Sequence, residues 1–230
     1  MHTLPAMIPN AKIYNLKHQR FWLLPQKAIY WQRKKTLLVA DLHIGKTGHF
    51  RKSGIAVPKQ VNSSNLEILS TLIADTSAEH LVIVGDLFHS SFNKEWQQFV
   101  DWRKKYQTLE VSLVIGNHDI LKHKNYHSGF INLFKKLTLD PFLFVHDLDE
   151  LNNPKKIDKY VLSGHVHPAV KLKGKGRQVI KLPCFYFGTA YGVLPAFGQF
   201  TGTHIITPKN NDQVFIIVDS QILSTEQNSL

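Results

Sequence analysis

Cysteine is almost absent from this chain, in which Cys184 is the only one among 230 residues. A single cysteine excludes an intramolecular disulfide, and with it the small secreted domains that disulfides stabilise, so we expect a reducing compartment. Cys184 lies in the apolar run 182–187 without a basic neighbour that would lower the pKa of its thiol. We therefore expect a small buried side chain and not a nucleophile.

Long apolar runs are missing as well. No stretch approaches the roughly 18 apolar residues that a membrane helix needs, and residues 1–5 lack both the basic and the apolar part of a signal peptide. There is also no internal repeat and no long Pro/Gly/Ser linker. We expect a cytoplasmic protein without a membrane partner, folded as one domain over residues 1–230, with a core at about 27–218 and a frayed tail at 220–230.

Acidic residues are scarce relative to basic ones. The chain has 17 Asp and Glu against 28 Lys and Arg, which gives a formal net charge of +11. Many basic residues are clustered, at 33–35, 103–105, 135–136, 155–156 and 171–177. Such a surface attracts polyanions, nucleic acid among them. Each cluster taken alone is equally well explained as a solvated face, so charge by itself does not identify a partner.

The first half of the chain alternates apolar strands with helices. We expect strands at 27–31, 36–41, 80–86 and 111–115, and helices from Pro58 onward and around 96–103. In the strand-rich second half we expect strands at 142–145, 160–162, 178–182, 184–187, 203–207 and 214–218. A short helix is predicted at 130–137, after an irregular Lys/His-rich segment at 122–127. The pattern predicts an α/β (α+β) fold, a four-layer αββα sandwich of two mixed sheets flanked by helices.

Residues of the kinds that bind metal ions stand directly after five of these strands. They are Asp41 and His43, Asp86, Asn117 with His118 and Asp119, His146, and His165 with His167. A glycine precedes Asp86, Asn117 and His165, where it lets the backbone turn sharply as the strand ends. In an open α/β sheet, ligands bind beyond the carboxyl ends of the strands, so we expect these side chains to converge on one crevice.

This mixture of carboxylate, amide and imidazole groups can hold two cations that share one carboxylate. Mixed oxygen and nitrogen ligands suit Mn, Fe or Zn better than Mg, which prefers oxygen ligands and water. Two cations about 3.5–4 Å apart clamp a phosphoryl group and lower the pKa of a bridging water, so that hydroxide attacks phosphorus near neutral pH. The residues therefore predict two-metal hydrolysis of phosphoesters.

The five blocks resemble the pattern of the calcineurin-like metallophosphoesterase superfamily, which is D-x-H, G-D, G-N-H-D/E, H and G-H-x-H in that order. All five are intact here. The resemblance implies the fold of that superfamily and a two-metal centre. It divides the ligands between the two ions, with Asp41, His43 and His167 at the first and Asn117, His146 and His165 at the second.

The same resemblance assigns roles to the other three residues. Asp86 bridges both ions. His118 is not a ligand; it lies over the substrate phosphate and protonates the leaving oxygen, for which imidazole is suited because its pKa lies near neutrality. Asp119 orients His118, as a carboxylate commonly does for a functional histidine.

Other histidines compete for some of these places. No signature flanks His146, and His123 and His127 lie upstream of it, but the apolar strand before His146 and the polar Asp147 after it favour His146 as the ligand. His89 is a candidate for the rim of the site. The remaining histidines near these regions, His49 and His204, are not expected to bind metal.

Beyond the metal-binding blocks, the chain is similar to a narrower family, the ligase-associated DNA damage response endonucleases (PdeM), also labelled helicase-associated phosphoesterases. The matching stretches are 40–46, 50–51, 54–58, 85–89, 164–170, 182–185, 194–198 and 200–202. This resemblance implies manganese-dependent cleavage of phosphodiester bonds in DNA, single-stranded DNA in particular. It also implies work in DNA repair beside a repair ligase and an Lhr-type helicase.

Several residues are candidates for contacts with such a substrate. Lys46 and Arg51 follow the first block and could meet phosphates beside the scissile bond, with surface salt bridges as an equal alternative. Five aromatic residues are candidates for base stacking, or else for core packing: Phe185, Tyr186, Phe187, Tyr191 and Phe197.

Two alternative functions remain open at this stage. The first is a phosphodiesterase or phosphatase of the same fold that acts on nucleotides or phosphoproteins. The second is a metal-free nucleic-acid-binding module, which would be expected to have lost a ligand, whereas every block is intact here. The sequence does not specify the physiological metal, the strand polarity, endonuclease against exonuclease action, the oligomeric state or the role of residues 120–128.

Overall fold

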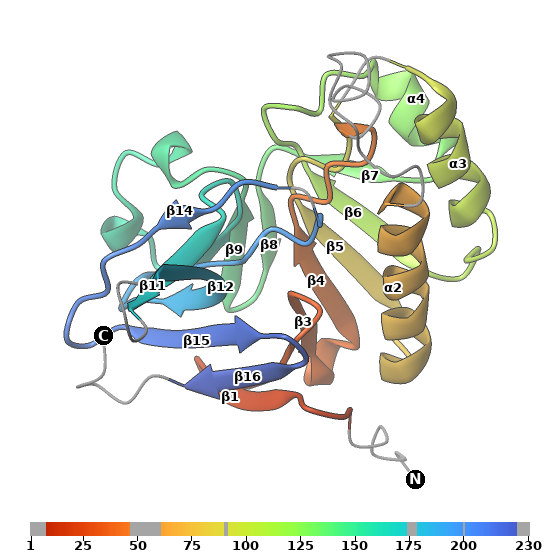
Figure 1. Ribbon diagram of the computed structural model, residues 1–230. Coiled ribbons are helices and arrows are strands. Elements are labelled where there is room, and N and C mark those ends of the chain that lie inside the picture. Colours follow the sequence, from red (N-terminus) through yellow and green to blue (C-terminus); the bar gives the residue numbers. More distant parts are fainter. Residues whose placement is uncertain (1–7, 47–60, 90–91, 174–178, 200, 225–230) are drawn as a thin grey trace, which may run out of the picture.

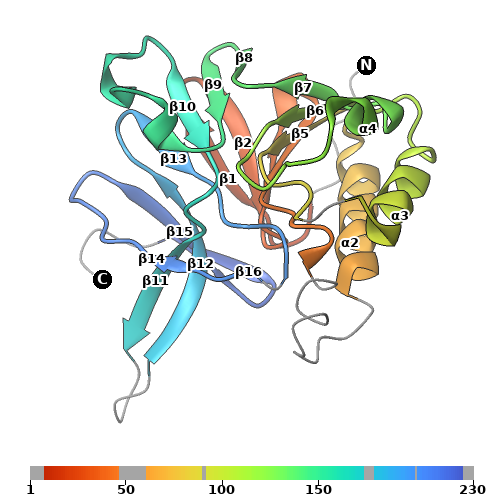
Figure 2. The same cartoon turned by 90° about the horizontal axis from the view of Figure 1, so that it is seen from above.

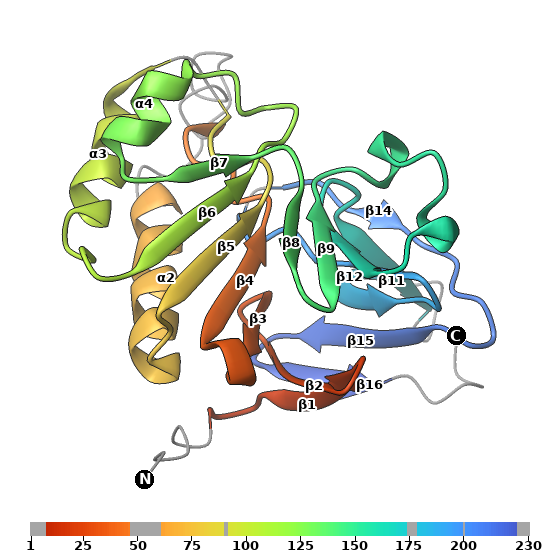
Figure 3. The same cartoon turned by 180° about the vertical axis from the view of Figure 1, so that it is seen from behind.

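The computed structural model describes residues 8–46, 61–89, 92–173, 179–199 and 201–224. Two β-sheets pack face to face, and the described α-helices lie against the outer face of the first sheet (Figures 1 and 3). The predicted fold class, two mixed sheets with helices outside them, is confirmed. No described helix combines the length and the apolar character needed to cross a membrane.

The first sheet has seven strands whose order in the sheet follows the chain. They are β1 (Lys12–Leu16), β2 (Gln19–Leu24), β3 (Ala28–Trp31), β4 (Thr36–Ala40), β5 (His80–Val84), β6 (Glu110–Val114) and β7 (Asn132–Phe134). Strands β1 to β4 are antiparallel, and β4 to β7 are parallel. The parallel strands read as continuous apolar runs because layers cover both of their faces. Their carboxyl ends lie at one edge of the sheet.

The second sheet is mixed and branched. It consists of β8 (Leu137–Leu139), β9 (Phe142–Val145), β10 (Tyr160–Ser163), β11 (Pro168–Lys173), β12 (Val179–Phe187), β13 (Tyr191–Val193), β14 (His204–Ile205), β15 (Gln213–Val218) and β16 (Gln221–Ser224). The path β14-β11-β12-β13-β10-β9-β8 carries a branch, in which β15 pairs with β12 and β16 pairs with β15. Strand β10 is parallel to β9 and β13. The carboxyl ends of β9 and β10 therefore lie together.

The helical layers on the two sides are unequal. The described α-helices are α2 (Val61–Thr76), α3 (Lys94–Arg103) and α4 (His123–Ser128), and the described 3-10 turns are η1 (Gln32–Lys34), η2 (Leu148–Glu150) and η3 (Pro154–Lys156). The α3 helix begins at Asn93, whose side chain accepts hydrogen bonds from the backbone N–H groups of Glu95 and Trp96. Over β9 and β10, the segment that contains η2 and η3 packs Leu151 against Val145 and Val161, so short turns form the fourth layer.

A shared core fixes the two sheets relative to each other. Phe21 and Trp31 of the first sheet meet Phe142 of the second, with ring centroids 5.1 and 5.0 Å from that of Phe142. All three rings are fully buried. Burial of one such side chain stabilises the fold by about 1.5–3 kcal/mol. Trp31 lies opposite Thr36 at the start of β4, and Phe142 is the first residue of β9, so these rings join the two sheets at the strand ends opposite to the predicted ligands.

The segment between β6 and β9 differs from the sequence prediction. The predicted helix at 130–137 is wrong, since β7 and β8 lie there, and the predicted irregular segment 122–127 contains α4. The α4 helix is anchored by Tyr126, whose buried ring lies 5.2 Å from Trp96 in an edge-to-face contact. Strand β7 pairs with the open edge of β6. Pairing and packing with distant residues decided both elements, and local periodicity does not report such contacts.

Three further expectations about strands are corrected. The two strands expected at 178–182 and 184–187 form one strand, β12, which runs through Pro183. Its partner changes there, because residues before Pro183 pair with β11 and residues after it pair with β15. The first sheet also includes β1 and β2, outside the expected core at 27–218. The tail expected to fray from 220 contains β16, which pairs with β15.

Candidate metal centre

The ladder between β4 and β5 continues beyond both strands into the loops that carry the first predicted ligands. The backbone N–H of Asp41 donates to the carbonyl of Gly85 at 3.1 Å, and that of His43 donates to the carbonyl of Asp86 at 2.9 Å. On the other side, the N–H of Gly198 donates to the carbonyl of Asp41 at 3.1 Å. The loops at the carboxyl ends are therefore held as rigidly as strands.

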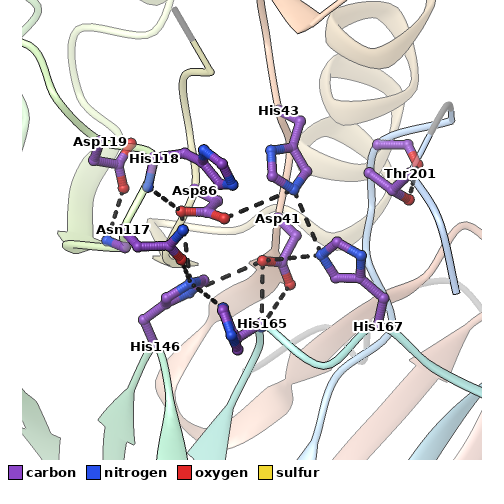
Figure 4. Close-up of polar contacts among 12 residues, drawn as sticks. Asp41, His43, Asp86, Asn117, His118, Asp119, His146, His165, His167 and Thr201 are labelled. Atoms are coloured by element: carbon purple, nitrogen blue, oxygen red, sulfur yellow. Dashed lines mark hydrogen bonds and ion pairs between the residues drawn. The ribbon is translucent and has the colours of Figure 1, made fainter. Parts of the chain in front are cut away.

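Five of the predicted ligands adopt a left-handed backbone conformation, which is uncommon for residues other than glycine. Their φ angles are 53° at Asp41, 49° at His43, 50° at Asp86, 65° at His165 and 53° at His167. Each such residue costs on the order of 1 kcal/mol or more, and such strain concentrates at functional sites. The tight turns aim these side chains into one crevice at the carboxyl ends of the strands (Figure 4).

Two glycines make room for ligand side chains. A Cβ atom on Gly85 would overlap the imidazole of His146, and a Cβ atom on Gly164 would lie 2.7 Å from Oδ2 of Asp41. Gly85 also has a φ angle of 79°, which favours glycine. The glycines that precede Asp86 and His165 in the sequence thus allow close packing around the site as well as sharp turns.

The first group of possible metal ligands consists of Asp41, His43 and His167. Nε2 of His167 lies 3.5 Å from Nε2 of His43 and 3.4 Å from Oδ1 of Asp41. One ligand atom from each residue lies within 4.8 Å of the others, which is compact enough for one metal ion. Asp41 is completely buried and His43 is 4% exposed.

The second group consists of Asp86, His146 and His165, with the same compactness. Nε2 of His146 lies 3.5 Å from Oδ1 of Asp86 and 3.1 Å from Nδ1 of His165. Oδ1 of Asn117 lies 3.0 Å from the same Nε2 atom, so Asn117 joins this group. His146 is 1% exposed, whereas the competing histidines His123 and His127 are exposed on α4 and belong to neither group.

Asp86 lies between the two groups. Its Oδ1 faces His146 of the second group, and its Oδ2 lies 3.7 Å from Nε2 of His43 in the first. The backbone N–H of His118 donates to Oδ1 at 2.9 Å, which fixes the orientation of the carboxylate. The position fits a carboxylate shared by two ions.

Three of the histidines have a protein acceptor at their outer ring nitrogen, and with a proton on that nitrogen each of them directs a lone pair inward. Nδ1 of His146 lies 3.3 Å from the carbonyl of Val84, and Nδ1 of His167 lies 3.0 Å from the carbonyl of Gly202. Nε2 of His165 lies 3.5 Å from Oδ2 of Asp147. These are the outer contacts that orient a metal-binding histidine. Asp147 and Gly202 were not predicted as part of the site, although Asp147 directly follows His146 in the sequence.

The inner atoms of the site are consequently almost all acceptors. With its proton on Nδ1, His146 faces Asn117, His165 and Asp86 with a lone pair, and none of these three inner atoms has a proton to donate. Lone pairs and carboxylate charges at 3.0–3.5 Å repel one another unless positive charge lies among them. A divalent cation in each group would supply that charge, and mixed oxygen and nitrogen ligands suit a transition metal.

Burial sets the protonation of His43. Burial, followed by the charges of the nearby Lys46 and of three neighbouring histidines, lowers the pKa of His43 to about 2. His43 is therefore neutral near pH 7, the form in which imidazole binds metal. Its Nδ1 atom has no hydrogen-bond partner among the described residues.

His118 lies beside these groups with its ring stacked on that of His89. The two ring centroids are 3.9 Å apart and the planes are inclined by 32°. The ring centroid of His43 lies 5.5 Å from that of His118 and 5.3 Å from that of His89, and the His43 ring is edge-on to both. The structure therefore brings His89, expected at the rim, into direct contact with the histidine predicted to act as the acid.

Asp119 makes contacts that differ from the expected ones. Its Oδ1 accepts a hydrogen bond from the backbone N–H of Phe88 at 3.1 Å, and its Oδ2 accepts one from that of Gly116 at 2.9 Å. Burial raises the pKa of Asp119 to about 7, although both hydrogen bonds oppose the shift. No hydrogen bond among the described residues joins it to the His118 ring, so its expected role in orienting His118 stays a prediction. Asp119 instead ties the loop after β5 to the loop after β6.

Of the two basic residues predicted to contact substrate, only Lys46 lies within the described residues. Lys46 is half-buried directly after the first ligand loop, where burial lowers its pKa while the charges of Asp86 and Asp41 raise it. Arg51 lies outside the described residues. Lys46 is thus close enough to the site for its ammonium to be influenced by two of the ligand carboxylates.

Three other sequence expectations concern residues away from the centre. Arg103 is not part of a basic surface, because it is 4% exposed and its guanidinium donates to the carbonyls of Tyr106 and Leu109. Among the aromatic candidates, Phe185, Phe187 and Phe197 are buried in the core, whereas Tyr186 and Tyr191 are half-buried. Cys184 is fully buried, and burial raises the pKa of its thiol to about 12, so the expectation that it is not a nucleophile holds.

The solved structures include clear relatives of this chain. A crystal structure of Pseudomonas putida nuclease MPE is 33% identical and superposes with a TM-score of 0.78, covering 93% of this chain and 100% of that one. Yfce, a phosphoesterase from E. coli, is a distant likeness at 14% identity and a TM-score of 0.44, covering 84% and 99% of the two chains. No curated protein sequence matches. The family model of the calcineurin-like phosphoesterases matches residues 34–175, more than half of the chain, and the chain therefore belongs to that family.

Proposed function

We propose that this metal-dependent phosphoesterase is a phosphodiesterase with two metal ions that cleaves single-stranded DNA, with Mn as its ion, in DNA repair. The observation that carries the proposal is the convergence of two groups of possible ligands at the carboxyl ends of the strands, with Asp86 facing both groups. In this assignment Asp41, His43 and His167 hold the first ion. Asn117, His146 and His165 hold the second, and Asp86 contacts both.

The bound ions would supply positive charge to the phosphoryl oxygens and lower the pKa of a water molecule near phosphorus. The residues of the chain supply the rest. His118 lies beside the ligand groups without belonging to either, so its ring is available to the substrate. As water adds to phosphorus and the ester P–O bond breaks, His118 donates a proton to the leaving oxygen. His89 supports the His118 ring by stacking against it.

Two observations support DNA as the substrate. The solved relative that covers almost the whole chain is described as a nuclease, and the net charge of +11 favours a polyanion over a small neutral substrate. Work in repair, a cytoplasmic location and association with a repair ligase or an Lhr-type helicase stay predictions from the sequence.

The proposal is tested with the purified protein and defined substrates. Loaded with Mn, it is expected to hydrolyse bis(p-nitrophenyl) phosphate and to cleave an end-labelled single-stranded oligonucleotide at internal positions. The same assays with Fe, Zn and Mg rank the metals. Hydrolysis of the small diester without cleavage of DNA would contradict the nuclease assignment and leave the phosphoesterase chemistry intact.

The competing function is a phosphatase or phosphodiesterase that acts on nucleotides or phosphoproteins. Rates on a cyclic nucleotide and on a phosphopeptide, measured beside those on the oligonucleotide, discriminate between these substrates. A non-catalytic nucleic-acid-binding module would bind the oligonucleotide and leave every phosphoester intact. The complete set of converging acceptors argues against that module, since binding DNA alone needs no such cluster.

A further inference from the structure

A two-stranded arm begins at the candidate metal centre. Strand β11 starts at Pro168, directly after the possible ligand His167, and pairs antiparallel with β12. Seen from above, the β11–β12 hairpin projects away from the body of the molecule (Figure 2). A ligand bound along this arm would therefore reach the candidate metal centre at the base of the arm.

The two faces of the arm differ in character. On one face Val170 is buried, with Leu172 and Leu182 packed beside it. On the other face lie Lys171 and Lys181, both exposed. Because side chains alternate along a strand, this second face of β12 is the one that carries Phe185 further along, in the core between the sheets. The lysine face is thus a continuation of the inner face of the second sheet, beyond the region where the first sheet covers it.

The two lysines are partners in the ladder. Lys171 lies directly opposite Lys181 in the register of β11 and β12. Like charges in such positions have Cβ atoms about 4.5–5.5 Å apart and destabilise the pair of strands. Other described lysines form ion pairs, as Lys35, Lys104 and Lys159 do, but neither lysine of the arm pairs with a described carboxylate. A pair of uncompensated cations at this spacing suits an anion that contacts both.

We propose that the lysine face of the arm, defined by Lys171 and Lys181, binds the phosphodiester backbone of the DNA strand whose scissile bond lies at the metal centre. The proposal deepens the proposed function and rests on it. Lys171 is four residues from His167, about 13 Å along a strand, so the phosphates it contacts lie outside the cleaved linkage. Val179, 47% exposed, lies two residues from Lys181 on the same face and offers apolar surface to a base.

The test is the double variant Lys171→Gln/Lys181→Gln, assayed on the Mn-loaded protein with a single-stranded oligonucleotide. We expect KM to rise roughly fivefold to tenfold, and kcat at saturating substrate to change much less, because the arm contacts phosphates remote from the reaction. In a chelating buffer, where cleavage stops, the dependence of log affinity on log salt is expected to become shallower by roughly 0.7 for each phosphate that the variant no longer neutralises.

Two further variants serve as controls. Lys155→Gln/Lys156→Gln removes the same charge from η3, where both lysines are exposed, and is expected to leave KM and the salt slope as in the wild type. Lys171→Arg/Lys181→Arg keeps the charge and is expected to retain wild-type KM. The Tm, measured alongside, is expected to equal that of the wild type for the two control variants and to be no lower for the glutamine variant of the arm, which relieves the repulsion between the two lysines.

The outcomes separate this proposal from the proposed function. If the glutamine variant matches the η3 control in KM and salt slope, the arm does not bind DNA, whatever the enzyme cleaves. If the wild-type protein with Mn hydrolyses neither the small diester nor DNA, the proposed function fails. In that case a weakened affinity of the glutamine variant in chelating buffer would still support a nucleic-acid-binding arm.

Discussion

The two ligand groups are held in different ways. In the first group, Asp41 and His43 are buried and follow β4, a central strand whose ladder extends into their loop. In the second group, the His165 side chain is 40% exposed, and among the described residues its outer nitrogen contacts Asp147, which is itself partly exposed. Hydrogen-bonded backbone therefore holds the first group, whereas exposed side-chain contacts complete the second. We expect the first group to bind its ion more tightly.

The change with the largest expected effect removes what the two groups share. Asp86→Ala is expected to release both ions and to reduce turnover by about 10⁴-fold, since several kcal/mol of charge stabilisation are lost with the metals. Metal content by mass spectrometry and hydrolysis of bis(p-nitrophenyl) phosphate measure this. Asp101→Ala removes an exposed carboxylate from α3 and is expected to change neither. Two ions retained in the Asp86 variant would contradict a shared carboxylate.

Removal of one ligand from each group tests whether the first group binds its ion more tightly than the second. His43→Ala and His165→Ala are each expected to lower the metal content from two ions to one, with turnover reduced by about 10³-fold. We expect the ion left in His165→Ala to dissociate more slowly in chelator than the one left in His43→Ala, because His167 of the first group is less exposed than His165 of the second. Loss of both ions from either variant would mean that the groups do not act separately.

His118 belongs to neither group, and its removal separates metal binding from chemistry. His118→Ala is expected to keep both ions while turnover falls by about 10²-fold or more, the usual contribution of a general acid. The loss is expected to be smaller for a diester with a nitrophenol leaving group, which needs little protonation, than for DNA. Loss of metal from this variant would show that His118 is a ligand and that the role assigned to it is wrong.

The smallest expected effect concerns the outer contact of the second group. Asp147→Asn weakens the acceptor for Nε2 of His165 and is expected to lower the affinity for one of the two ions by about 10-fold. Titration of the metal-free protein with Mn measures both affinities. Asp149→Asn in the same turn is the control, because its side chain has no described contact with a ligand. Equal weakening of both ions would indicate that Asp147 does not act on the second group alone.

The ligand set could be predicted from sequence because its signals are local. Each member follows an apolar run, as Asp41 follows β4 and His146 follows β9, and a parallel strand is read from such a run. The direction of the strands then brings their carboxyl ends together without further information. The fold class followed from the same alternation of strands and helices.

Other features could not be predicted from the sequence, for a physical reason. Strand β7 exists because β6 has an open edge for it, and Asp119 faces the backbone of Phe88, which lies 31 residues away in the chain. Arg103 looks like part of a basic surface until its carbonyl partners are known. For β7 and Asp119 the deciding partner is distant in sequence, and for Arg103 the nearby carbonyls reach the guanidinium only because of the way the chain turns after α3.

By itself, the sequence determined which residues can bind metal and in what order they follow their strands, because strand periodicity and ligand chemistry are properties of short segments. Only the tertiary structure decided that Asp86 faces both groups, that Asp147 contacts His165, and that two lysines lie opposite each other on one arm with no ion-pair partner among the described residues. These are relations between segments, and they depend on how the shared core of Phe21, Trp31 and Phe142 sets one sheet against the other.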